Sequence, residues 1–62
     1  MFSNNLYNLM LQAVEEHKAL WRITTSYMED ANEESRAYWN TLKEEKEATI
    51  LKLKELIKKE LN

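Results

Sequence analysis

The sequence predicts an all-α protein, an antiparallel two-helix hairpin that dimerises into a four-helix bundle. Neither glycine nor proline occurs among its 62 residues, although average usage would be about 7% and 5%. Sheet proteins need both residues in their tight turns. The apolar residues recur at alternating spacings of three and four, which is the period of a helix. The chain also lacks cysteine, and chains this short usually add disulfides, a metal or a partner subunit to a marginal core.

The first apolar run predicts a helix from about residue 4 to about residue 29. Ser3 or Asn4 can cap its start, because either side chain can accept a hydrogen bond from a free amide of the first turn. At 1.5 Å per residue, such a helix is about 40 Å long.

A turn is expected at about residues 30–32. Asp30 and Asn32 are both suitable caps for a following helix, and Asp30 with Glu33 has the spacing of a capping box. A short link of this kind makes the two helices antiparallel neighbours. A single unbroken helix is the alternative, because no residue of the link forbids helical backbone.

The second helix is expected from about residue 33 to about residue 60, which makes residues 1–62 a single domain. Glu33 and Glu34 lie in its first turn and Lys58 and Lys59 in its last turn, where the helix dipole favours those charges.

The two helices carry more apolar surface than one hairpin can cover, and exposed apolar patches of that size are rare on monomers. A second hairpin related by two-fold symmetry would supply the missing wall of a four-helix bundle. The side chains expected at this homodimer interface are large and apolar, namely Leu6, Met10, Val14, Leu20, Trp21, Trp39, Leu42, Ile50, Leu53 and Ile57.

A polar layer is expected halfway along the hairpin. With a turn near residue 31, positions whose numbers add up to about 63 face each other, so His17 should lie level with Lys46 and Thr49. Helical bundles hold metals in layers of histidine and carboxylate, which makes Glu16, His17 and Glu47 the candidate metal ligands. The alternative is that His17 bonds a carboxylate or hydroxyl and sets the helix register. The Lys46 ammonium favours that alternative, because it would repel a metal cation, so no metal or other cofactor is expected.

The motif content indicates no enzyme and no catalytic residues, because neither a nucleophile–base pair nor a Gly-rich phosphate loop is present. The net charge of −2 argues against a nucleic-acid partner. No apolar run is long enough to span a membrane, and the first residues lack the features of a signal peptide. A cytoplasmic location is therefore expected.

The segments LQAVEEHKALWRITTSYMEDA and AYWNTLKEEKEATILKLKELI resemble one helical pair of the rubrerythrin/ferritin-like proteins. The resemblance implies a four-helix bundle, which in that family binds two iron ions through Glu and Glu-x-x-His ligands. Those ligands do not carry over, because Lys46 and Thr49 occupy the Glu-x-x-His positions and His17 lies nearest the first-helix glutamate position. A shifted alternative, Glu44 with Glu47, has no histidine. The resemblance thus implies a half-length member that keeps the bundle and has lost the iron.

We therefore expect a small self-associating helical bundle that acts as a protein-interaction or regulatory module, with itself and an unidentified protein as partners. The first alternative is a ferritin-like metal-binding bundle formed by a homo-oligomer. The second is a nucleic-acid-binding homodimer like the Rop-type hairpin, which is similar in architecture only.

Overall fold

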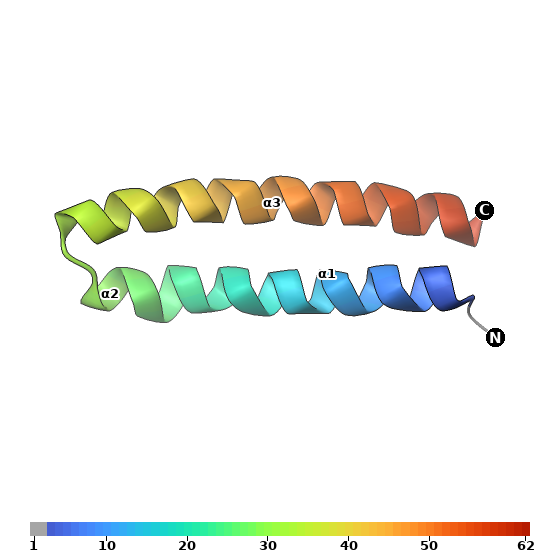
Figure 1. Cartoon of the computed structure of the whole chain (residues 1–62), viewed down its shortest axis with the longest axis horizontal. Coiled ribbons are helices and arrows are strands. Elements are labelled where there is room, and N and C mark those ends of the chain that lie inside the picture. Colours follow the sequence, from blue (N-terminus) through green and yellow to red (C-terminus); the bar gives the residue numbers. More distant parts are fainter. Residues whose placement is uncertain (1–2) are drawn as a thin grey trace.

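The computed structural model describes residues 3–62 as two long helical rods that lie side by side (Figure 1). The first rod is α1 (Asn4–Arg22), which continues through the π-helical segment η1 (Ile23–Tyr27) into α2 (Met28–Asp30). The second rod is α3 (Glu33–Leu61), which returns so that both ends of the chain lie at one end of the hairpin. The all-α class and the presence of two helices are thereby confirmed.

Both rods begin at a side-chain cap. Ser3 Oγ accepts a hydrogen bond from the Leu6 amide at 3.1 Å, and Asn32 Oδ1 accepts one from the Ser35 amide at 2.8 Å. Of the two caps that the sequence offers for the second helix, Asn32 is the one used. Asp30 instead ends α2, and the extended backbone of Ala31 and Asn32 reverses the chain.

The π-helical segment shifts the inward-facing side of the first rod by one residue. Before it, inward residues follow spacings of three and four up to Ile23, which is 2% exposed. The next partly buried residue is Met28, five positions later. The Met28 amide accordingly donates to the Ile23 carbonyl, the i→i−5 bond of a π-helix. One additional residue is thereby accommodated without turning the last part of the rod away from α3.

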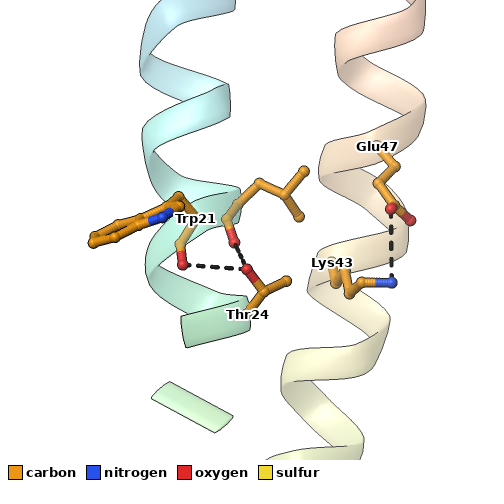
Figure 2. Close-up of polar contacts among 5 residues, drawn as sticks. Trp21, Thr24, Lys43 and Glu47 are labelled. Carbon is orange, nitrogen blue, oxygen red and sulfur yellow. Dashed lines mark hydrogen bonds and ion pairs between the residues drawn. The ribbon is translucent and has the colours of Figure 1, made fainter. Parts of the chain in front are cut away.

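Two threonine hydroxyl groups lie within hydrogen-bond distance of one backbone carbonyl oxygen next to η1. Thr25 Oγ1 donates to the Trp21 carbonyl oxygen at 2.6 Å, and Thr24 Oγ1 lies 3.2 Å from the same oxygen. Side chains that bond backward in this way accompany local departures from the regular helical ladder. Figure 2 shows the Thr24 hydroxyl beside the Trp21 carbonyl oxygen.

The contact between α1 and α3 forms a narrow core. Its most buried members among the described residues are Leu6, Glu16, Ile23 and Leu53. The molecule measures 45 × 16 × 12 Å, and its radius of gyration is 14.2 Å. A compact domain of 62 residues would have a radius of gyration of about 11 Å, so this hairpin is an elongated rod with a core on one side of each helix only. Within residues 3–62, neither rod contains a stretch long and apolar enough to cross a membrane.

Candidate interaction surface

A buried ion pair joins the two rods halfway along their length. Lys46 Nζ lies 2.8 Å from Glu16 Oε2, and the side chains are 28% and 11% exposed. Gln12, one turn earlier on α1, donates from Nε2 to Glu16 Oε1 at 3.1 Å. Glu16 Oε1 therefore accepts a hydrogen bond, and Glu16 Oε2 has the Lys46 ammonium as its ion-pair partner, so the buried charge is compensated.

Contact with Lys46 determines the protonation of Glu16. The hydrogen bond from the Lys46 ammonium holds the pKa of the Glu16 carboxyl below its ordinary value. Burial acts in the opposite direction, and the Gln12 hydrogen bond and the Lys46 charge add to the lowering. Glu16 is therefore an anion between the rods at neutral pH.

The prediction that His17 faces Lys46 in this polar layer is wrong. The layer exists at the expected level, but Glu16 occupies it, whereas His17 and Thr49 are exposed. Successive residues of a helix point about 100° apart, so placing Glu16 toward α3 turns His17 to the side of the hairpin. There His17 borders a groove of about 420 Å³ with Trp21, Lys43 and Glu47.

The three candidate metal ligands do not form one cluster. Glu16 is held by Lys46 between the rods, whereas Glu47 pairs with Lys43 at 3.6 Å on α3. Over the part of the chain that the structure describes, no three histidine, cysteine or acidic side chains come together as a metal site would need. The ammonium at 2.8 Å from Glu16 also does not fit a metal cation beside that carboxylate.

A stripe of large apolar side chains on α1 has no partner in the hairpin. It consists of residues at helical spacing that are between 37% and 65% exposed, namely Tyr7, Met10, Val14 and Trp21. We call these four residues the outer stripe. Leu11, which is 48% exposed, lies beside the outer stripe. Leu11 and the first three residues of the stripe line a shallow groove of about 230 Å³. Figure 2 shows the Trp21 ring directed away from α3.

The ten residues expected at a dimer interface fall into three groups. Leu6 and Leu53 are buried between the rods of a single chain and have little surface left for a second copy. A second set lies partly covered along the contact between the rods, namely Leu20, Trp39, Leu42, Ile50 and Ile57. Met10, Val14 and Trp21 are exposed and remain available. Tyr7 belongs with them and was missed, although its spacing from Met10 and Val14 carries the signal.

The aromatic residues near the turn pack mainly against one another. The Tyr27 and Trp39 ring centroids are 4.8 Å apart, and those of Tyr38 and Trp39 are 5.3 Å apart. Tilted aromatic pairs at such distances stabilise a fold beyond the area they bury. This cluster ties the end of the first rod to the start of α3.

Comparisons with family models, with curated proteins and with solved structures give no match for this chain. The ferritin-like resemblance therefore stays a prediction, and the geometry of the hairpin carries the functional argument.

Proposed function

We propose that this protein is a self-associating helical module, in which two hairpins join through the outer stripe of α1 and present the remaining surface to other proteins. The observation that carries the proposal is the amount of exposed surface. The hairpin exposes 4994 Å², whereas a compact folded protein of 7.5 kDa exposes about 4,200 Å².

The difference of about 800 Å² matches the surface that one partner contributes to a standard protein–protein interface, also about 800 Å². The outer stripe supplies its apolar part. Two aromatic anchors, Tyr7 and Trp21, lie at the ends of this stripe, and such residues often dominate binding energy. A second hairpin laid over this stripe would cover the apolar patch and bring the exposed area per chain near that of a compact domain.

The proposal is tested by the mass of the protein in solution at micromolar concentration. Light scattering or sedimentation should give about twice the 7.5 kDa mass of one chain. The variant Val14→Glu places a charge in the stripe and should shift the protein toward monomer. Asn8→Glu places the same charge on an exposed part of α1 outside the stripe and should leave the mass unchanged. A stably folded wild-type monomer at these concentrations would refute the proposal.

A further inference from the structure

We infer that two copies of this chain associate in antiparallel orientation about a two-fold axis. In this dimer, α1 lies against α1 of the second copy, and Val14 lies next to the axis. This inference rests on the proposed self-association and adds the direction and register of the partner. Three properties of the described residues support it, namely the spacing of the outer stripe, the distribution of charge within α1 and the distribution of charge along the rod.

The two ends of the outer stripe are symmetric about Val14. Tyr7 lies seven residues before Val14 and Trp21 seven residues after it, so both are about 10.5 Å from it along the helix. An isologous two-fold contact requires a surface that is complementary to itself. In the antiparallel arrangement, each Tyr7 ring meets the Trp21 ring of the second copy, and the aromatic anchors pair at both ends.

Charge within α1 separates the two possible directions. Residues 1–14 carry no charged side chain, whereas Lys18 and Arg22 flank the second half of the stripe. A parallel contact would place Lys18 beside Lys18 and Arg22 beside Arg22 of the second copy, and like charges that face each other across an interface oppose binding. The antiparallel contact places each of these cations beside the uncharged first half of the other α1.

Charge along the whole rod favours the same direction. The chain's net charge of −2 divides unequally, because residues 1–14 and 49–62 together carry +2 and residues 15–48 carry −4. The first group forms the end of the hairpin where both ends of the chain lie, and the second includes the turn (Figure 1). In the antiparallel dimer, the positive end of each hairpin lies along the negative end of the other. Opposite charges then face each other, as they do in complementary interfaces.

The test uses single cysteines in the full chain, which contains no cysteine of its own. A disulfide forms only where two Cα atoms approach within about 7 Å. Under mild oxidation, Val14→Cys should therefore cross-link to itself at least about tenfold faster than Tyr7→Cys, whose two copies lie about 21 Å apart along the helices. Mixing Tyr7→Cys with Trp21→Cys should give the mixed disulfide that neither variant forms alone.

Tyr7→Cys and Trp21→Cys each remove an aromatic side chain of the proposed interface and could weaken the dimer. A second pair of cysteine variants therefore keeps both aromatic residues. Met10 and Lys18 lie four residues before and four residues after Val14. A mixture of Met10→Cys with Lys18→Cys should therefore form a mixed disulfide that neither variant forms alone. Thr49→Cys, an exposed position on α3, is the matched control and should not cross-link.

The outcomes separate this inference from the proposed function. A protein of dimeric mass in which Tyr7→Cys cross-links to itself as fast as Val14→Cys overturns the antiparallel arrangement and leaves self-association standing. A dimer in which no stripe position cross-links overturns it as well, because the contact then lies elsewhere. A monomeric wild-type protein removes both proposals.

Discussion

Removing Lys46 tests whether the ion pair between the rods governs the stability of the hairpin. Lys46→Met keeps most of the side-chain stem and leaves the Glu16 side chain, 11% exposed, without its ammonium partner. Two unit charges 2.8 Å apart attract by about 6 kcal/mol at an effective dielectric constant of about 20. Most of this attraction is offset by the cost of removing both charges from water. Because Lys46 is still 28% exposed, we expect a net coupling of about 1–2 kcal/mol.

The assay is a double-mutant cycle of Lys46→Met with Glu16→Leu, measured by denaturant unfolding at one fixed protein concentration. Lys46→Met alone should lower the free energy of unfolding by about 2 kcal/mol at pH 7, since it leaves a buried charge unpaired. The double variant should recover most of that loss. Lys52 and Glu55, which lie 3.8 Å apart on the exposed side of α3, form the control pair and should couple by less than about 0.5 kcal/mol.

The same cycle predicts a dependence on pH with a definite sign. The pKa of Glu16 is lower in the folded protein than its ordinary value, so the ionised carboxylate stabilises the fold at pH values above the unfolded pKa, about 4.3. That stability is lost as the pH falls through the depressed folded pKa. The coupling should therefore be full at pH 7 and smaller at a second, acidic pH below that unfolded value. A coupling below about 0.3 kcal/mol at pH 7, or one equal at both pH values, would contradict this account.

Three further changes test the helix cap, the π-helical segment and the core, each by denaturant or thermal unfolding. Asn32→Ala removes the cap of α3 and should lower the free energy of unfolding by about 1 kcal/mol. Asn40→Ala, at an exposed position within α3, is the control and should not lower it. Equal effects of the two variants would show that the cap contributes no stability. Deleting Ser26 should convert η1 into regular helix and leave the melting temperature within a few degrees, because it removes the additional residue. Deleting Lys18 should abolish cooperative unfolding, because the deletion turns the first part of α1 by about 100° relative to α3. Similar behaviour of the two deletion variants would refute the explanation that η1 accommodates one additional residue. Ile23→Ala should cost about 2–5 kcal/mol, and Leu61→Ala, at a position 63% exposed, less than about 0.5 kcal/mol; comparable losses would contradict the placement of the core.

Local chemistry in the sequence predicted both helices and favoured the hairpin over a single unbroken helix. The absence of glycine and proline leaves the chain without helix breakers and without the residues that the tight turns of sheets use. Ser3 and Asn32 are short polar side chains at positions where a helix begins, and both act as caps in the structure. Such signals are local, because each depends on residues within one turn of the chain.

Tertiary packing alone decided which of two neighbouring residues enters the polar layer. Glu16 and His17 both continue an apolar pattern of threes and fours, and α1 carries two such stripes, one facing α3 and one facing outward. A sequence pattern gives the period of a stripe but not the direction of the neighbouring helix. Contact with α3 selected the stripe that contains Leu6, Glu16 and Ile23, because its side chains pack against those of the second rod. The same contact required the π-helical turn after Ile23, and it left Tyr7, Met10, Val14 and Trp21 on the outside, where a partner can bind.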